Sequence, residues 1–152
     1  MKIAGLLQRI LPPVWLGMVC AIAMEAQLKF QAPNVTREIG LGISKLVFTV
    51  LNRAECAFAV LLLVAFFISA AARKAQIIFG AILLILLAQT FWLIPNLIER
   101  IDSITGGNAP PDSSVHLFYI AFEICKIILL LTLSILTSRE SFNLKKLKDI
   151  EA

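Results

Sequence analysis

The chain has 152 residues, of which 59% are hydrophobic and 16% charged, and its formal net charge is +4. A soluble domain of this size carries about 25% charged and about 45–50% apolar residues, so this composition excludes water as the only solvent. The basic residues stand at the edges of apolar blocks, where they mark topology and meet lipid headgroups, so the positive charge does not indicate nucleic-acid binding. The length allows a single domain.

The first apolar segment, about residues 4–26, predicts a membrane-spanning helix. Two prolines at positions 12 and 13 predict either the entry to the main helix or a kink. A cleaved signal peptide is the alternative, because Lys2 and Arg9 form a basic start and residues 21–23 resemble a small-residue cleavage site. The prolines count against it, since they interrupt the apolar region.

Residues 27–51 have a different texture. Ala32-Pro33-Asn34 predicts a turn with Asn34 as a helix N-cap. Apolar residues then recur with helical spacing and form one stripe, which consists of Ile39, Ile43, Leu46, Val47 and Val50. We therefore expect an additional amphipathic helix over about residues 35–51, lying in the membrane interface between spans 1 and 2.

Three further apolar segments predict spans over about residues 52–72, 75–95 and 115–137. Only Arg73-Lys74 separates the second from the third, so these two should form a tight antiparallel hairpin. Pro95 should end or bend the third helix, and residues 103–114 read as a loop. A basic tail over 138–152 contains Lys145, Lys146 and Lys148. The predicted fold is thus all-α: an integral membrane four-helix bundle, one domain over 1–152, with an extra interfacial helix.

The distribution of Lys and Arg predicts the orientation. With the N-terminus inside, eight of these residues flank the inner ends of the spans and five flank the outer ends. We therefore expect a multi-pass protein of the cell membrane (the inner membrane in a bacterium), with both termini cytoplasmic.

The fourth span carries polar groups at spacings of three, four and three: His116, Tyr119, Glu123 and Lys126. They occupy about an 80° arc, so they face one neighbour or one cavity. Lys126 lies about 15 Å below His116, near mid-membrane, and Glu123 one turn away is its expected partner. Ionisable groups within a span cost at least a few kcal/mol unless paired or hydrated, so each needs a reason.

The other spans add polar groups. The third repeats the same spacing, the first ends in a Glu25–Lys29 pair, and the second opens with Asn52-Arg53-Ala54-Glu55. In the predicted topology all of them map to the outer half of the bundle, which favours an outward-facing polar pocket that binds or passes a small solute or ion. The candidate binding residues are Glu25, Asn52, Arg53, Glu55, Gln89, Asn96, His116, Tyr119, Glu123 and Lys126.

Alternatives remain open. The same groups could serve as interhelical glue in a non-catalytic assembly subunit, whose partners would be lipid, a second copy or another membrane protein. A metal site is a further alternative, drawn from Glu25, Glu55, His116 and Glu123. No cofactor is predicted, because no phosphate loop or cofactor motif occurs and no cysteine forms a CxxC.

Several short motifs occur in order along the chain: Trp15-Leu16-Gly17, Ala32-Pro33, Leu46-Val47-Phe48, Asn52-Arg53-Ala54-Glu55 and His116. In these motifs the chain resembles the domain-of-unknown-function 4149 family, small membrane proteins related to human transmembrane protein 205. The resemblance spans most of the chain and implies a four-helix membrane protein with no established reaction. The human relative's link to drug resistance implies transport. The Glu123 and Lys126 pair is not expected from the family, so its role is argued from position alone.

An integral membrane enzyme is the third hypothesis. The membrane-associated eicosanoid and glutathione enzymes place an arginine four residues before the asparagine of an Asn-x-x-Glu motif. Asn52 and Glu55 fit that motif, but position 48 is phenylalanine, so the glutathione-binding arginine is missing.

Overall fold

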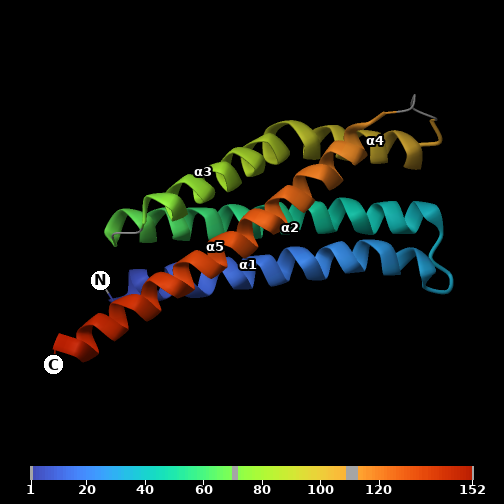
Figure 1. Cartoon of the computed structure of the whole chain (residues 1–152). Helices are drawn as coiled ribbons and strands as arrows, with labels where there is room; N and C mark the ends of the chain where they lie inside the picture. Colours follow the sequence, from blue (N-terminus) through green and yellow to red (C-terminus); the bar gives the residue numbers. More distant parts are fainter. Residues whose placement is uncertain (1, 70–71, 109–112, 152) are drawn as a thin grey trace.

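The computed structural model describes residues 2–69, 72–108 and 113–151, with the side chains of all of these except residues 2, 27 and 140–151. The elements are α1 (Lys2–Leu28), the 3-10 turn η1 (Lys29–Gln31), α2 (Arg37–Ile68), α3 (Arg73–Ala88), the π-helical segment η2 (Gln89–Leu93), α4 (Ile94–Thr105) and α5 (Val115–Glu151). Four helical stretches are long and apolar enough to cross a membrane, with α3, η2 and α4 forming the third. The predicted all-helical bundle is confirmed at this level (Figure 1).

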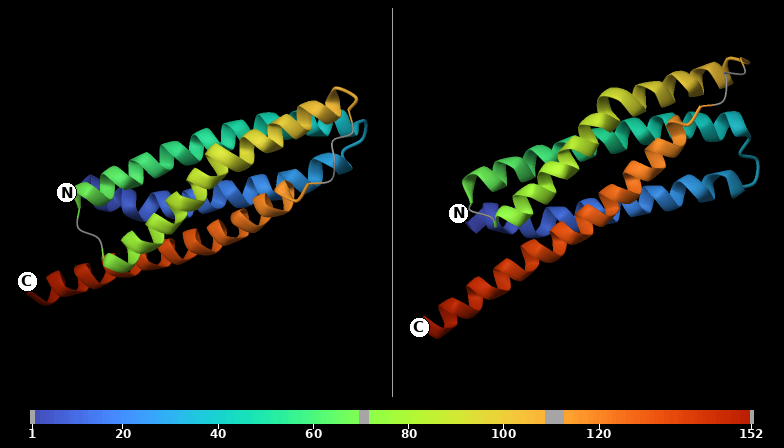
Figure 2. Two further views of the ribbon diagram at one scale, coloured as in Figure 1. Left: turned by 90° about the horizontal axis from the view of Figure 1, so that it is seen from above. Right: turned by 45° about the horizontal axis from the view of Figure 1, so that its top comes forward.

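Both termini lie at the same end of the bundle, here called the inner end, and the α1–α2 and α4–α5 connections lie at the opposite, outer end (Figures 1 and 2). α1 packs against α2 on one side and against α5 on the other. The third stretch changes partner along its length, because α3 packs mainly on α5 whereas α4 packs mainly on α2. The crossover falls at η2.

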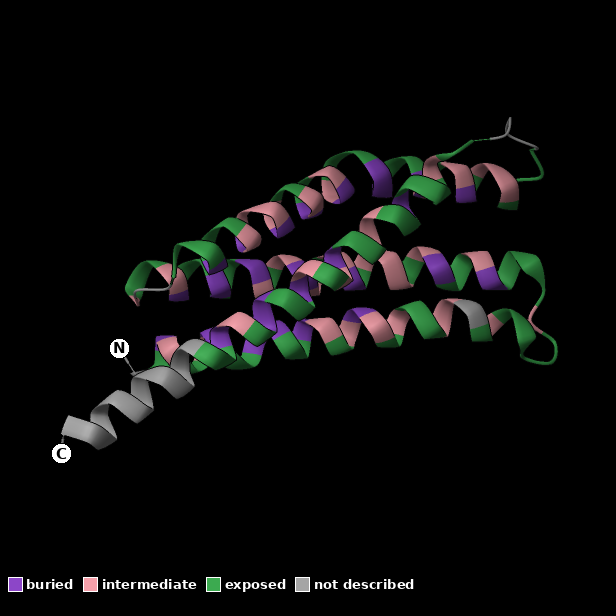
Figure 3. Cartoon of the chain, viewed as in Figure 1, coloured by how far each residue is buried: buried purple, intermediate pink, exposed green. Residues whose placement is uncertain are grey.

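Two clusters of buried apolar side chains fill the bundle. The larger, in the inner half, includes Trp15, Leu62, Ile82 and Leu130. The smaller, in the outer half, is built on Leu93, Ile94, Leu97 and Tyr119. Large apolar side chains also cover much of the outside. Figure 3 marks the exposed residues of each helix in green. Such an exterior fits helices whose solvent is lipid.

The separate interfacial helix is not present. Residues 37–51 are the first half of α2, which continues unbroken through the second span to Ile68. The reason is that the buried positions of both halves share one helical phase, in the series Gly40, Ser44, Leu51, Glu55, Ala59 and Leu62. The N-cap is also displaced: Thr36 Oγ1 accepts the bond from the Ile39 N–H, and Asn34 instead occupies the left-handed turn position with φ 68°.

None of the three prolines at positions 12, 13 and 95 ends a helix. α1 runs through Pro12 and Pro13 without ending, with Pro12 itself buried in the bundle. Pro95 does not end the third helix, which continues as α4 to Thr105. Because proline brings no backbone N–H, the helix adjusts just before it, where η2 widens to a bond between the Ile94 N–H and the Gln89 carbonyl.

α5 extends through the expected tail as far as Glu151. The side chains of Lys145, Lys146 and Lys148 lie outside the described part of the chain, as do residues 109–112 of the predicted loop.

We predict that reporters fused to the two termini lie on one side of a membrane and that a reporter inserted at Asn108 lies on the other. The expectation follows from four spanning stretches with both ends together. Paired fusions to green fluorescent protein and alkaline phosphatase measure the side at each site. Release of the N-terminal reporter from the chain would instead support a cleaved signal peptide.

Candidate functional site

A fully buried lysine lies at the crossing of the helices. The Lys126 Nζ atom is 2.6 Å from Glu55 Oε1, 2.9 Å from Glu123 Oε1 and 2.8 Å from Gln89 Oε1. An ammonium group has three N–H donors, and here each one has an acceptor. The side chain of Lys126 is 0% exposed, so no bond to water replaces any of these contacts.

The acceptors are themselves held by neighbours. The Trp15 indole N–H donates to Glu55 Oε1 at 2.9 Å, and the Gln89 amide N–H donates to Glu123 Oε1 at 2.9 Å. We call these five residues the Lys126 cluster. It draws on α1, α2, η2 and α5, so every spanning stretch supplies at least one member. The expected Glu123–Lys126 pair is confirmed, and Glu55 joins it from across the bundle.

The cluster lies near the middle of the bundle and not in its outer half. Trp15 is 13 residues from the start of α1 and Glu55 is 13 residues from the end of α2, which puts both about 20 Å from the inner ends. It also separates the two apolar clusters. Along the third stretch, Leu86 belongs to the inner cluster and Leu93 to the outer one, and Gln89, which binds Lys126, lies between them.

Gln89 owes its position to η2. The wide π turn begins at Gln89, whose side chain is buried against α5, and ends one residue before α4. On the neighbouring position, Thr90 Oγ1 donates to Asn52 Oδ1 at 2.8 Å and ties η2 to α2. π-helical turns are rare and occur frequently at functional sites.

A pocket of about 190 Å³ adjoins the cluster on its outer side, between α1, α2 and α5. Most of its wall is apolar, and its polar side chains are His116, Tyr119 and Glu123, all from the predicted stripe on α5. Tyr119 is buried, with its hydroxyl beside the Glu123 carboxylate and its ring 5.0 Å from that of Phe48. His116 is exposed near the outer end of α5, so the pocket runs about 10 Å along that helix from His116 to Glu123.

Four candidate residues lie elsewhere. Glu25 pairs with Lys29 at 3.5 Å near the end of α1. Arg53 is exposed on α2, and Asn96 is exposed with its amide bonded to the Trp92 carbonyl of its own helix. Asn52 touches the site only through Thr90. Among the residues that the structure describes, no three His, Cys, Asp or Glu side chains gather where they could hold a metal ion.

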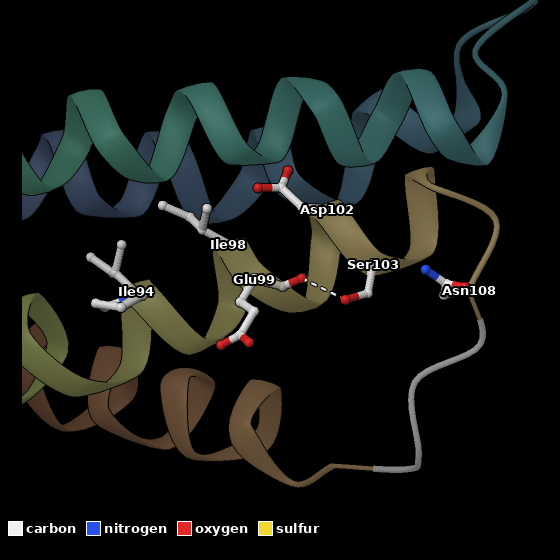
Figure 4. A pocket seen from close by; sticks show the side chains of 7 residues that line it. Ile94, Ile98, Glu99, Asp102, Ser103 and Asn108 are labelled. Atoms are coloured by element: carbon white, nitrogen blue, oxygen red, sulfur yellow. Dashed lines mark hydrogen bonds between the residues drawn. The ribbon is translucent and has the colours of Figure 1, made fainter.

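A second hollow of about 680 Å³ runs along α4 at the outer end, and Figure 4 shows its side chains. It is a shallow surface feature lined by α4 and Asn108. Asp102 reaches α2, where both of its oxygens bind Lys45 at 2.6 and 2.7 Å, and Glu99 is exposed. Exposed ion pairs contribute about 0–1 kcal/mol to the free energy of unfolding, so this contact adds little to the stability of the bundle.

Two buried side chains that form hydrogen bonds between helices, Trp15 and Gln8, were not among the candidates. Trp15 carried a signal, because an indole N–H in the middle of an apolar span needs an acceptor. Gln8 carried a similar one: its amide donates to the Ala65 carbonyl at 2.9 Å and to the Ser69 carbonyl at 3.1 Å, which joins α1 to the end of α2. In neither case does the sequence name the acceptor.

No family model, no curated protein and no solved structure matches this chain. The resemblance to the domain-of-unknown-function 4149 family therefore stays a prediction that depends on the short motifs.

We predict that Lys126→Leu lowers the free energy of unfolding by about 3–5 kcal/mol, because it leaves two buried carboxylates without their ammonium. Glu123→Gln should cost no more than about 1 kcal/mol, since Glu55 still balances Lys126 and the new amide oxygen can accept the same bond. Thermal unfolding of the purified proteins in detergent measures both. Equal melting temperatures for the two variants would contradict the charge assignment.

Trp15→Phe should lower the free energy of unfolding by at least about 1.5–3 kcal/mol, because the bond to the charged Glu55 is lost and the smaller phenyl ring leaves part of the buried space unfilled. Trp92→Phe is the matched control, since Trp92 is half exposed, and it should change the stability by about 0.5 kcal/mol or less. The same unfolding measurement applies. If both substitutions have equal effects, the indole N–H of Trp15 contributes nothing specific.

Proposed function

We propose that this chain is a multi-pass protein of the cell membrane, with cytoplasmic termini, that binds a small solute or ion in the pocket between α1, α2 and α5. The four spanning stretches and the shared position of the termini support the membrane arrangement. The excess of Lys and Arg near the inner ends supports the orientation.

The observation that carries the proposal is that Glu123 belongs both to the pocket and to the Lys126 cluster. One carboxylate both lines the pocket and binds the buried ammonium of Lys126. An apolar pocket with a few convergent polar groups is the usual form of a small-molecule site. Transporters of several folds bind their substrates near the bilayer midplane beside interrupted helices, and here η2 interrupts the third stretch at that depth.

Access is from the outer side. Inward of the Lys126 cluster, the core is closed by tightly buried apolar side chains that include Leu62, Ile82 and Leu133, each 0% exposed. Passage of a solute across the membrane therefore requires a second arrangement of the helices, whereas binding does not. η2 is the natural point for such a change, since the stretch switches its packing partner there.

A non-catalytic assembly subunit is the second candidate function. It is favoured by the hydrogen bonding of Lys126, because all three N–H donors of its ammonium group bind protein acceptors. This is expected of polar contacts that hold helices together. Its partners would be lipid, a second copy or another membrane protein. An enzyme is the third candidate, for which the described polar side chains of the pocket, His116, Tyr119 and Glu123, would supply the reactive groups.

The test is ligand-dependent thermal stability of the detergent-purified protein, screened over pH, divalent metals and small charged solutes. A ligand present at a hundred times its dissociation constant should add about 2.7 kcal/mol to the free energy of unfolding. We expect Glu123→Gln to abolish the shift and Glu99→Gln, which removes an exposed carboxylate on α4, to preserve it.

The two functions predict different results. A shift that Glu123→Gln removes supports the pocket. No shift with any additive favours the assembly subunit, as does a shift that survives Glu123→Gln unchanged, because the carboxylate would then have only a structural role.

A further inference from the structure

Building on the proposed pocket function, we propose that the ligand is a small organic monocation and that its binding releases one proton held by the carboxyl pair of Glu55 and Glu123. The geometry that points to this exchange is the meeting of two carboxylates and one ammonium at the closed end of the pocket.

The charges of the Lys126 cluster do not balance when all three groups are ionised. Glu55 and Glu123 each carry one negative charge, and Lys126 carries the only positive charge among the five members. The side chains of Lys126 and Glu55 are 0% and 3% exposed and that of Glu123 is 13% exposed, so water screens the difference only weakly. An uncompensated buried charge costs several kcal/mol. Neutrality therefore needs one more positive charge, which is either a proton on the carboxyl pair or a cation in the pocket.

The elements packed around Glu123 carry few other charged or titratable groups. α5 itself offers Lys126, Tyr119 and the exposed His116, and α2 offers Glu55. Among the side chains that the structure describes, η2 contributes the neutral Gln89 and α1 the neutral Trp15. None of the described pocket residues is a lysine or arginine. Lys126 has no donor left for a ligand, and Glu123 Oε1 already accepts from Lys126 and Gln89. A ligand in the pocket would therefore meet the Glu123 carboxylate beside the Tyr119 hydroxyl.

The wall of the pocket selects among cations. Divalent metals require several oxygen ligands, whereas this wall is mostly aliphatic with the aromatic rings of Phe48 and Tyr119. Apolar side chains and aromatic faces suit the alkyl groups of an organic ammonium ion, and aromatic rings attract its charge. The pocket has the volume of about six waters, which sets the scale of a small ammonium ion. An anion is disfavoured by the carboxylate at the closed end.

The exchange is balanced. In the empty state one O–H bond on the carboxyl pair holds the proton. When the monocation enters, that bond breaks, the proton leaves through the outer mouth past His116, and the cation takes over the neutralising role beside Glu123. One positive charge enters and one leaves, so the charge of the buried site does not change.

The experiment is titration calorimetry on the full-length protein in detergent, in two buffers with different ionisation heats. The probes are tetramethylammonium, choline and tetraethylammonium, with 3,3-dimethylbutan-1-ol as the uncharged isostere of choline. We expect at least one cation to bind with release of about one proton, an affinity that rises about tenfold per pH unit while the pair is protonated, and at least tenfold weaker binding of the alcohol.

Three variants locate the exchange. Glu123→Gln should weaken cation binding at least tenfold and abolish proton release, and Glu99→Gln should change neither. Ala23→Phe fills the pocket from α1 at a position outside the Lys126 cluster, so it should block binding even if the Glu123 variant does not fold.

Each outcome separates the claims. Equal affinity for choline and its uncharged isostere overturns the cation class but leaves the pocket function standing. Cation binding without proton release overturns the exchange. If none of the three cations binds while another solute stabilises the protein, the ligand class is wrong and the pocket function survives. If nothing binds, both are overturned.

Discussion

The ammonium group of Lys126 and its three acceptors constrain the rest of the bundle. Burying an unpaired charge costs several kcal/mol, so this lysine is tolerated only where Glu55, Gln89 and Glu123 reach it together. Those acceptors come from α2, η2 and α5, and Trp15 adds α1 through Glu55. A shift of any one helix by a single residue would break a contact. The cluster therefore sets the register of helices whose apolar surfaces alone would allow several.

The π-helical segment follows from the same constraint. A regular α-helix through residues 89–93 would present these side chains at other angles, and Pro95 would leave a carbonyl without its N–H partner. Widening one turn accommodates the proline and directs Gln89 toward Lys126 while Thr90 binds Asn52 on α2. It also lets the third stretch lean from α5 onto α2. One local irregularity thus serves packing and the polar network together.

Glu123 couples that network to the pocket. Because its carboxylate belongs to both, any ligand that meets it also changes the electrostatic balance of Lys126 and Glu55. The buried core of the inner half is mostly apolar, and its buried polar side chains, Gln8, Ser134 and Thr137, are neutral, so they cannot change this balance. The same few charged groups therefore affect both the stability of the bundle and ligand binding. A substitution in the Lys126 cluster is expected to change both.

The sequence by itself determined the four apolar stretches, the side-by-side termini of an even number of spans, and the polar stripe of α5 with its Glu123–Lys126 pair. These are local properties, since length, composition and helical spacing decide them. Only the tertiary structure decided that Glu55, Gln89 and Trp15 complete the site while Glu25, Arg53 and Asn96 stay apart, because contacts between helices depend on which faces meet. The same holds for the helix boundaries. Polar residues suggested a separate helix before span 2, and the prolines suggested an entry or kink near position 12 and an end or bend at position 95. A shared buried face keeps α2 continuous, and both α1 and the third stretch continue through their prolines.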